Sequence, residues 1–298
     1  MSKVYIMMSA YNGEKYISEQ IDSILRQRGI EFKLFIRDDG STDATVKIIQ
    51  EYRKHDSRII LYQGENIGWK RSFLRLLSKI PDDADYYAFS DQDDIWLDDK
   101  IQRALKILKK MHGKRKCYCS AQTFVNENLE PFDFHIRKRF RYPDEYHCIT
   151  NGYGMGCTLV FDKDLLLTLK EGSLLKIRNI SHDLLVSVTA VYLGTIYRDQ
   201  KSRILYRQHG SNAGSRHENL YERMNRVLHF DGFFVRETAD YMLNYYQKQL
   251  TEKQKHILRQ FADIGKWKNK IALIFNRSVS RDTVSGTLKV KAYILISR

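Results

Sequence analysis

The sequence is poor in cysteine, has no long apolar run and has no leader-like segment at its start. Its four cysteines among 298 residues are too few for a disulfide scaffold, and Cys117 and Cys119 lack the C-x-x-C spacing of a zinc or thioredoxin site. No run of about 18 apolar residues is present, so we expect no membrane-spanning helix. No basic segment followed by an apolar one opens the chain, which argues against a secretory signal. These absences predict a reduced, cytoplasmic protein, and the 43% hydrophobic content predicts a globular core.

Acidic residues are outnumbered, and the imbalance is greatest at the C-terminus. The 36 Asp and Glu residues stand against 50 Lys and Arg, which gives a net charge of +14. Residues 264–298 hold eight basic residues and one acid, a net +7 and half of the excess. Basic clusters interleaved with aromatic and apolar residues suit an anionic membrane surface or a nucleic acid. Because no nucleic-acid signature accompanies them, we interpret the segment as a peripheral attachment to the inner face of the cell membrane.

Two parts of this basic segment carry apolar residues. One is a predicted helical face with lysines beside it, formed by Trp267, Ile271, Ile274 and Phe275 with Lys266, Lys268 and Lys270. The other, residues 288–296, fits a strand and an amphipathic helix equally well. A packed C-terminal subdomain or a dimer contact is the alternative to membrane attachment, and the oligomeric state is not readable from the sequence.

Short apolar runs alternate with amphipathic segments through the first 112 residues. Strands are predicted over 4–8, 32–36, 59–62 and 86–90, and helices over 14–28, 43–54, 69–78 and 99–111. This alternation predicts an α/β fold with a mostly parallel central sheet flanked by helices on both faces. The pattern loosens after residue 112, with a basic stretch at 136–141, and becomes helical again from about 218. We therefore divide the chain into 1–112, 113–217 and a basic, mainly helical extension over 218–298.

Three polar loops directly follow predicted strands. They begin at Ser9-Ala-Tyr-Asn, Asp38-Asp-Gly-Ser and Ser90-Asp-Gln-Asp-Asp. Because ligands of such sheets bind beyond the carboxyl ends of the strands, the three loops predict one site. In the second loop a strand-end aspartate could accept a hydrogen bond from an imide N–H or a ribose hydroxyl, and Gly40 permits a tight turn. Ser41, Thr42 or Asp43 is expected to cap the next helix.

The third loop gathers carboxylates in a basic protein. Crowded carboxylates raise each other's pKa unless a cation neutralises them, and oxygen ligands select Mg²⁺ or Mn²⁺. We therefore predict a metal site at Asp91 and Asp93, directly after a buried strand. Asp98 and Asp99 precede a predicted helix, and we expect them to cap it. The sequence leaves the role of Asp94 open.

Three segments carry a family resemblance. The runs MSAYNGEKYISEQIDSILRQ, FIRDDGSTDAT and AFSDQDDIWLDDKI, in that order and spacing, resemble the family 2 glycosyltransferases with a GT-A nucleotide-sugar fold. They are especially similar to the bacterial rhamnosyltransferase-like branch, where SDQDDIW is the usual form of the DxD segment. The resemblance is specific over residues 1–110, is sparser to about 215 and does not cover the C-terminal tail. It implies that the first part binds a nucleotide sugar and that residues 113–217 bind the acceptor.

The resemblance implies roles for the donor side. Ser9, Tyr11 and Asp39 would hold the base, with Tyr11 stacked on a pyrimidine and Asp39 at its N3–H. Asp91 would bind ribose or metal-bound water, and Asp93 would bridge the metal to the diphosphate. Arg71 occupies a position that often contacts the base or phosphate, and a solvated helix arginine is the alternative.

The resemblance also implies roles for three later segments. Gly156, Cys157 and Thr158 would belong to an acceptor-side loop that supports the leaving diphosphate, unless they form only a structural turn. Asp183, in Ser181-His-Asp183, would be the general base, although the segment would also cap a helix. In the segment YRQHGSN, His209 would be a metal ligand and Arg207 would neutralise phosphate; a structural histidine is the alternative.

Taken together, the resemblance implies metal-dependent transfer with inversion at the anomeric carbon. The best-fitting donor is dTDP-L-rhamnose, with a UDP-hexose as the alternative, and the acceptor would be a hydroxyl of a cell-surface glycan or of a lipid-linked glycan. A nucleotidyltransferase would need a glycine-rich, basic phosphate loop after the first strand, which is missing. A basic membrane- or polyanion-binding module with an inactive core is the rival from another class, and the intact acids on three loops argue against it.

Overall fold

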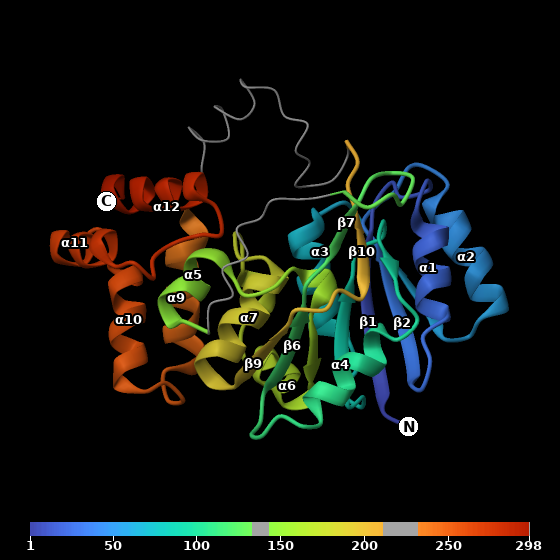
Figure 1. Cartoon of the computed structure of the whole chain (residues 1–298), viewed down its shortest axis with the longest axis horizontal. Helices are drawn as coiled ribbons and strands as arrows, with labels where there is room; N and C mark the ends of the chain where they lie inside the picture. The colour runs from blue at the N-terminus through green and yellow to red at the C-terminus, as the bar shows by residue number, and fades with distance from the viewer. Residues whose placement is uncertain (133–142, 211–231, 298) are drawn as a thin grey trace.

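The computed structural model describes residues 1–132, 143–210 and 232–297 (Figure 1). The stretch at 136–141, the 217/218 border and residues 218–231 of the predicted extension lie outside the described residues. The first part alternates as the sequence predicts: β1 (Lys3–Ala10), α1 (Ile17–Leu25), β2 (Glu31–Asp38), α2 (Thr45–His55), β3 (Ile59–Gln63), α3 (Trp69–Lys79), β4 (Tyr86–Ser90), β5 (Ile95–Trp96) and α4 (Lys100–Leu108).

The later elements are less regular. They are β6 (Lys116–Ser120), β7 (Thr123–Val125), α5 (Glu145–Asn151), β8 (Val160–Asp162), α6 (Lys163–Glu171), α7 (His182–Leu193), β9 (Thr195–Asp199), β10 (Ile204–Arg207), α9 (Phe233–Tyr246), α10 (Glu252–Ala262), α11 (Trp267–Phe275) and α12 (Val284–Ile296). Short 3₁₀ turns occupy Gly156–Thr158 and Leu174–Lys176. The undecided segment at 288–296 is therefore helical.

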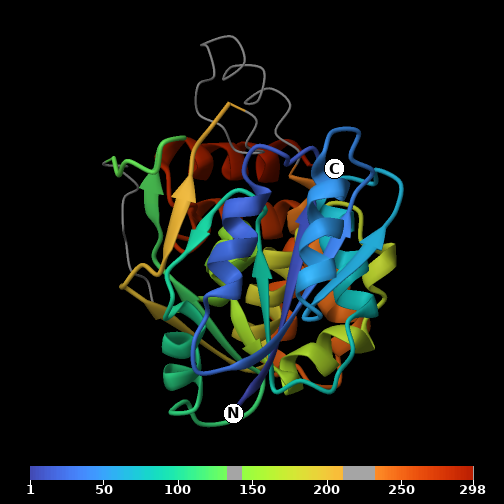
Figure 2. The same cartoon turned by 90° about the vertical axis from the view of Figure 1, so that its right-hand side faces the viewer.

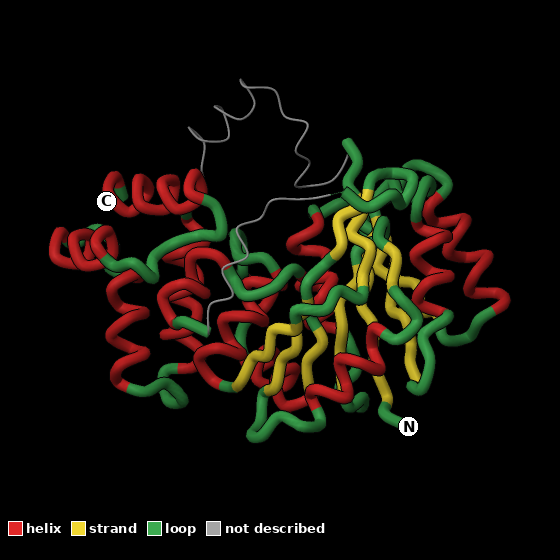
Figure 3. The backbone as a smooth tube through the Cα atoms, viewed as in Figure 1, coloured by secondary structure: helices red, strands yellow, loops and turns green. Residues whose placement is uncertain are grey.

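The central sheet has seven strands in the order β3-β2-β1-β4-β8-β6-β9. The β1, β2, β3 and β4 strands pair in parallel, β8 runs antiparallel to both of its neighbours, and β6 pairs in parallel with β9. The sheet is thus mostly parallel, as predicted. A small second sheet joins β5, β10 and β7. Helices cover the main sheet from both sides, with α1 and α2 in front of the strands in Figure 2 (Figures 2 and 3).

The strand β1 shows why both faces are covered. Alternate side chains of a strand point to opposite faces. Val4, Ile6 and Met8 pack in the core shared with α1, α2 and α4, whereas Tyr5 and Met7 pack in the core shared with α3, α6 and α7. Because all five side chains are buried, the run reads as continuously apolar instead of alternating.

The C-terminal helices fall into two kinds. The helices α9 and α10 are part of the main core, to which they contribute Val235, Met242 and Phe261 among other side chains. The helices α11 and α12 lie side by side at the end of the molecule remote from β1 (Figure 1) and expose many apolar side chains. One member of the predicted apolar face, Ile274, is only partly exposed because it packs against the core. No helix among the described residues combines the length and apolarity needed to cross a bilayer.

Candidate active site

Hydrogen bonds join the three loops that follow β1, β2 and β4. The Asp39 amide donates to the Ala10 carbonyl at 2.7 Å. The Asn12 amide donates to Ser41 Oγ at 2.9 Å. The Gln92 side chain makes two hydrogen bonds to the backbone of Tyr11. Gln92 Oε1 accepts from the Tyr11 N–H at 2.9 Å, and Gln92 Nε2 donates to the Tyr11 carbonyl at 3.0 Å. The structure therefore brings together the loops that the sequence assigns to one site, and it adds Gln92, whose contact to Tyr11 spans 81 residues.

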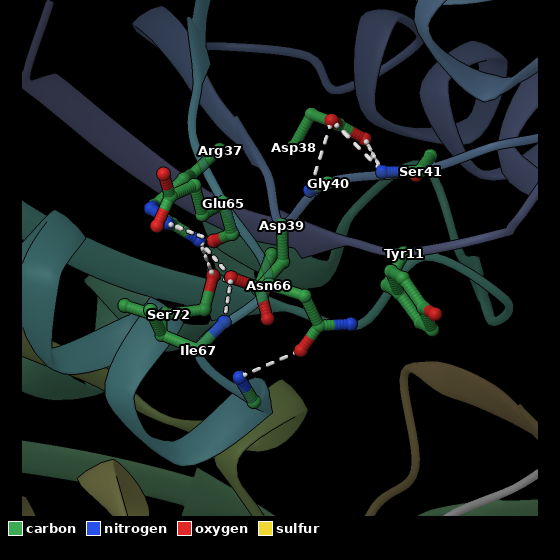
Figure 4. A network of polar contacts seen from close by, with 12 residues as sticks. Tyr11, Arg37, Asp38, Asp39, Gly40, Ser41, Glu65, Asn66, Ile67 and Ser72 are labelled. Carbon is green, nitrogen blue, oxygen red and sulfur yellow. Dashed lines mark hydrogen bonds and ion pairs between the residues drawn. The ribbon is translucent and has the colours of Figure 1, made fainter.

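Asp39 is the centre of a buried polar network (Figure 4). Its Oδ1 pairs with Arg37 Nη1 and accepts a hydrogen bond from the Ile67 amide at 3.0 Å. Arg37 Nη1 also donates to Ser72 Oγ at 3.0 Å, and Ser9 Oγ lies 2.5 Å from that hydroxyl. Among the described residues no group donates to Asp39 Oδ2, so this oxygen is available to a ligand N–H. The sequence analysis assigns no role to Arg37. The only sign of one in the sequence is a basic residue at the end of a predicted strand, directly before two aspartates.

The turn after Asp39 requires glycine. Gly40 has a φ of +82°, and a Cβ atom there would lie 2.8 Å from the Asn66 amide nitrogen. The Asp38 carboxylate closes this turn by accepting from the amides of Gly40 and Ser41, both at 3.1 Å. Asp43 Oδ1 accepts from the Thr45 amide at 2.9 Å, but the capping position of α2 is Ala44 and has no side-chain capping hydrogen bond, so the capping expectation for Ser41, Thr42 or Asp43 is wrong.

Two further donor-side residues are exposed. Tyr11 has 45% of its surface exposed, and in Figure 4 its ring stands apart from the Asp39 network with no polar contact drawn to it. Arg71 lies in the first turn of α3, is exposed and makes no side-chain hydrogen bond or ion pair with any described residue. Its contact to a nucleotide stays a prediction.

The acidic loop after β4 meets residues from distant parts of the chain. His209 Nε2 lies 2.9 Å from Asp93 Oδ2 across 116 positions of sequence. Burial raises the pKa of Asp91 to about 7, and the Asp93 and Asp183 carboxylates add to the shift. Asp91, Asp93, Asp183 and His209 therefore share one region, and the repulsion among the acids is of the kind that a bound cation relieves.

Asp94, whose role the sequence leaves open, points into the protein. It is fully buried; Oδ1 accepts from the Arg207 amide at 3.1 Å, and Oδ2 has no partner among the described residues. Asp91, Asp94 and Cys157 bring one ligand-type atom each within 4.8 Å of one another. Burial raises the pKa of the Cys157 thiol well above its usual value, which makes it a poor ligand for a hard cation.

The carboxylates of Asp91 and Asp93 and the imidazole of His209 are ligand types that Mg²⁺ or Mn²⁺ accepts. Metal binding by these three residues stays a prediction, because the group of ligand atoms that lies together among the described residues is Asp91, Asp94 and Cys157. Lys100 is a further buried cation nearby: its Nζ lies 3.5 Å from the Trp96 ring centroid and has no hydrogen-bond partner among the described residues. Burial lowers the pKa of Lys100 to about 7. In the sequence this residue looks like an ordinary helix lysine.

Asp183 lies in the first turn of α7. Its Oδ1 accepts from the Leu184 amide at 2.8 Å and from the Ser181 hydroxyl, while Oδ2 accepts from no described residue. Ser181 occupies the capping position without a capping hydrogen bond. The neighbouring His182 is buried between Phe73, 3.9 Å between ring centroids, and Phe89 at 4.5 Å. Burial lowers its pKa to about 4, so the ring is neutral near pH 7.

The turn Gly156–Thr158 packs closely against the His182 ring. A Cβ atom on Gly156 would lie 2.3 Å from His182 Nε2. Thr158 is buried, and its hydroxyl donates to the Met155 carbonyl at 2.8 Å. A ligand contact through the Thr158 or Cys157 side chain would therefore require the turn to rearrange. The alternative of a structural turn agrees with these contacts.

Arg207 is engaged with protein groups. Its guanidinium pairs with Glu19, donates to the Glu127 carbonyl at 3.0 Å and lies 4.6 Å from the Tyr16 ring centroid. The His209 ring stacks on the same tyrosine at 4.6 Å. Arg207 and Tyr16 therefore help to position His209, and the sequence analysis misses Tyr16 because its contacts lie more than 190 positions away.

The capping prediction for Asp98 and Asp99 is wrong. Asp99 occupies the position before α4 but makes no capping hydrogen bond; it pairs instead with Arg203 at 2.9 Å. Asp98 pairs with Arg28 at 3.2 Å. These arginines lie outside the helix, so local sequence gives no sign of the competition.

Comparison with known proteins decides the family. The family model described as glycosyl transferase family 2 matches residues 5–165. The chain belongs to glycosyl transferase family 2. Over 237 residues this glycosyltransferase is 32% identical to the dTDP-rhamnosyl transferase RfbG of Shigella flexneri, which covers 74% of this chain and 78% of the relative.

Other similar proteins are named with other nucleotide sugars. The enzyme is 30% identical over 175 residues to the UDP-Glc:alpha-D-GlcNAc-diphosphoundecaprenol beta-1,3-glucosyltransferase WfgD of Escherichia coli, which covers 55% of this chain and 61% of the relative. Among solved structures, Staphylococcus aureus TarS 1–349 with UDP-GlcNAc matches with a TM-score of 0.59 at 19% identity, over 87% of this chain and 71% of that one. The mannosyltransferase PcManGT from Pyrobaculum calidifontis, with GDP-Man and Mn²⁺, matches with a TM-score of 0.56 at 14% identity, over 99% and 76%. These likenesses confirm the GT-A fold.

Proposed function

We propose that this glycosyltransferase moves L-rhamnose from dTDP-L-rhamnose to a hydroxyl of a cell-surface or lipid-linked glycan, with inversion. The observation that carries the proposal is the convergence of Asp91, Asp93, Asp183 and His209 beside the joined loops of Tyr11 and Asp39. The RfbG relative, which this chain matches over most of its length, supports the rhamnose donor. A UDP-hexose is the second candidate, supported by WfgD.

The donor would bind across the first part of the chain, residues 1–112. The Tyr11 ring would stack on the pyrimidine, and Asp39 Oδ2 would accept its imide N–H, while Arg37 and Ser9 hold Asp39 and Ser72 in place. Arg71 would approach the nucleotide from α3. Asp91, Asp93 and His209 would hold Mg²⁺ or Mn²⁺, which when bound offsets the charge of the donor diphosphate.

The acceptor would react from the side of residues 113–217. Asp183 Oδ2 would take the proton of the acceptor hydroxyl, whose oxygen then bonds to the anomeric carbon. The bond from that carbon to the diphosphate oxygen breaks on the opposite face, and the nucleoside diphosphate leaves. A single base with no protein nucleophile gives inversion.

The donor is tested by incubating the purified protein and Mn²⁺ with a lipid-linked glycan extract and one nucleotide sugar at a time. We expect faster release of dTDP from dTDP-L-rhamnose than of UDP from UDP-glucose, measured by ion-exchange chromatography. Faster release of UDP would favour the second candidate. Release of neither nucleotide above the level of an Asp183→Asn control would contradict the proposal.

We further propose that α11 and α12 attach the enzyme to an anionic membrane and so bring it to a lipid-linked acceptor. Trp267, Phe275 and Leu295 have 66%, 80% and 62% of their surfaces exposed, in a segment of net positive charge. Apolar side chains beside lysines suit insertion among anionic headgroups.

Flotation with phosphatidylglycerol vesicles tests the membrane proposal. A Trp267→Glu/Phe275→Glu variant is expected to lose at least half of the vesicle-bound fraction. The control is Leu175→Glu, which changes an apolar residue with 56% exposure on another part of the surface. Equal flotation of all three proteins would contradict the proposal.

A further inference from the structure

A cavity of about 360 Å³ lies beside the proposed acceptor site, where the segment 277–284 and the first turns of α12 meet α5. It is separate from the proposed donor site, and the charged side chains of its wall are mainly basic. The charged and titratable side chains that line it are His147, Arg277, Arg281, Asp282 and Lys291. Two apolar residues of α12, Val284 and Leu288, line it as well and are 56% and 63% exposed.

The charges in this cavity are unbalanced. Asp282 is the one acid of the lining, and its carboxylate already accepts from Asn151 Nδ2 at 3.0 Å and lies 3.9 Å from His147 Nε2. Arg277 is exposed, and Lys291 Nζ donates to the Ile274 carbonyl at 2.7 Å. The wall therefore keeps an excess of positive charge.

Arg281 is a cationic side chain of the lining whose guanidinium has no described protein partner. It is partly buried, and within the part of the chain that the structure describes its guanidinium makes no hydrogen bond or ion pair; its nearest ring contact is Phe234 at 5.9 Å. Burial lowers the pKa of Arg281, and the carboxylates of Asp282 and Asp183 act in the opposite direction. A partly buried guanidinium whose five N–H donors have no described protein partner can pair with an anion that enters the cavity.

The cavity wall is joined to the helix that carries Asp183. Asn151 and Asp282 are linked by two hydrogen bonds, 3.0 Å and 3.3 Å long, which tie the wall to the end of α5. The next residue, Gly152, packs on Leu184, which directly follows Asp183: a Cβ atom on Gly152 would lie 3.6 Å from Leu184 Cδ1. The Asp183 carboxylate raises the pKa of Arg281, which is consistent with the two side chains lying near each other.

We propose that this cavity binds the phosphate or diphosphate of the acceptor, with Arg281 and Arg277 as its anion ligands. The arginine fork matches a phosphate with two parallel hydrogen bonds, and Lys291 adds a point charge. The anion held there would place the sugar linked to it towards Asp183, while Val284 and Leu288 face the lipid part. This inference rests on the proposed function and names its acceptor class as a glycan carried on a lipid phosphate or diphosphate.

The test is calorimetric titration of inorganic pyrophosphate into the full-length protein in EDTA, with saturating dTDP present to occupy the donor site. We expect binding that weakens at least tenfold in Arg281→Gln and in Arg277→Gln, since each loses a charge-assisted pair. Arg277 is exposed, so its variant separates loss of the site from loss of folding. Lys248→Gln, which removes an exposed lysine from another surface, is expected to bind as the wild type does.

Other outcomes would overturn the proposal. Equal binding by all variants, or no binding by the wild type, would show that the cavity does not bind the phosphate or diphosphate of the acceptor. If pyrophosphate fails to bind but Arg281→Gln reduces flotation on phosphatidylglycerol vesicles, the cavity holds a membrane headgroup and not the acceptor. Binding of dTDP is measured in the same samples with Mn²⁺; its absence would overturn the proposed function independently of the pyrophosphate result.

Discussion

Hydrogen bonds between loops tie the proposed donor side of the site together, whereas the side chains of Asp183 and Arg281 on the proposed acceptor side make no long-range hydrogen bond to a described residue. Unpaired polar atoms also occur on the proposed donor side, among them Asp94 Oδ2 and Lys100 Nζ. Gln92 holds Tyr11, and Ser41 holds Asn12, through contacts that join the ends of β1, β2 and β4. In contrast, within the described residues Asp183 Oδ2, both His182 ring nitrogens and the Arg281 guanidinium lack partners. The proposed donor side is thus ordered by its own loops, and the proposed acceptor side keeps unpaired groups at Asp183 and Arg281.

The largest effect is expected at the acceptor side. Asp183→Asn keeps the shape of the side chain but removes the base, so we expect transfer to fall by about 10³-fold, within the range usual for a general base. Binding of dTDP is expected to stay unchanged, because the donor loops do not depend on Asp183. Turnover close to that of the wild type would show that Asp183 is not the general base. Loss of dTDP binding would show that the proposed donor side depends on Asp183.

The buried His182, beside Asp183, predicts that the stability of the protein depends on pH. Its pKa is lowered from 6.5 to about 4, so between these values the unfolded chain takes up a proton that the folded chain does not. The free energy of unfolding therefore falls as the pH drops from about 6.5 towards 4, at about 1.4 kcal/mol per pKa unit, and by about 3 kcal/mol in all. Denaturant unfolding at several pH values is expected to show a shallower fall in His182→Phe. The same slope in both proteins would contradict a buried neutral histidine.

Packing around the acceptor loop is tight even where its polar groups are unpaired. Gly156→Ala places a methyl group 2.3 Å from His182 Nε2, and the aromatic neighbours of that ring leave it little room to move. We expect a loss of about 2 kcal/mol in the free energy of unfolding. Gly210→Ala is the control, because a Cβ atom there meets no atom of the described residues within 4 Å. Equal stability of the two variants would show that the turn gives way easily.

The same contrast governs what the sequence reveals. The sequence predicts the strand–helix alternation of residues 1–112 because the local apolar pattern determines it. It also predicts the loops at Asp39, Asp91 and Asp93 because they directly follow the strands. It does not predict the roles of Arg37 and Gln92, since these roles come from tertiary contacts, and Lys100 reads as a surface lysine although it is buried.

Beyond residue 112 the sequence is less informative. The apolar residues of α12 fit the repeat of a strand and the repeat of a helix equally well. Packing against α11, which the local sequence does not show, decides for the helix. The cavity at Arg281 needs α5, the loop 277–284 and α12 to meet, which no local pattern encodes. The capping expectation for Asp98 and Asp99 fails for the same reason, because distant arginines compete for both carboxylates.

The most direct test of the central claim is nucleotide binding by the donor side. Calorimetry with dTDP, UDP and ADP in the presence of Mn²⁺ would be compared for the wild type and Asp39→Asn. We predict that the wild type binds dTDP and UDP but not ADP, and that Asp39→Asn binds dTDP about tenfold more weakly because the acceptor for the imide N–H is lost. Equal affinity of the wild type for all three nucleotides, or unchanged dTDP binding in Asp39→Asn, would contradict a pyrimidine site built around Asp39.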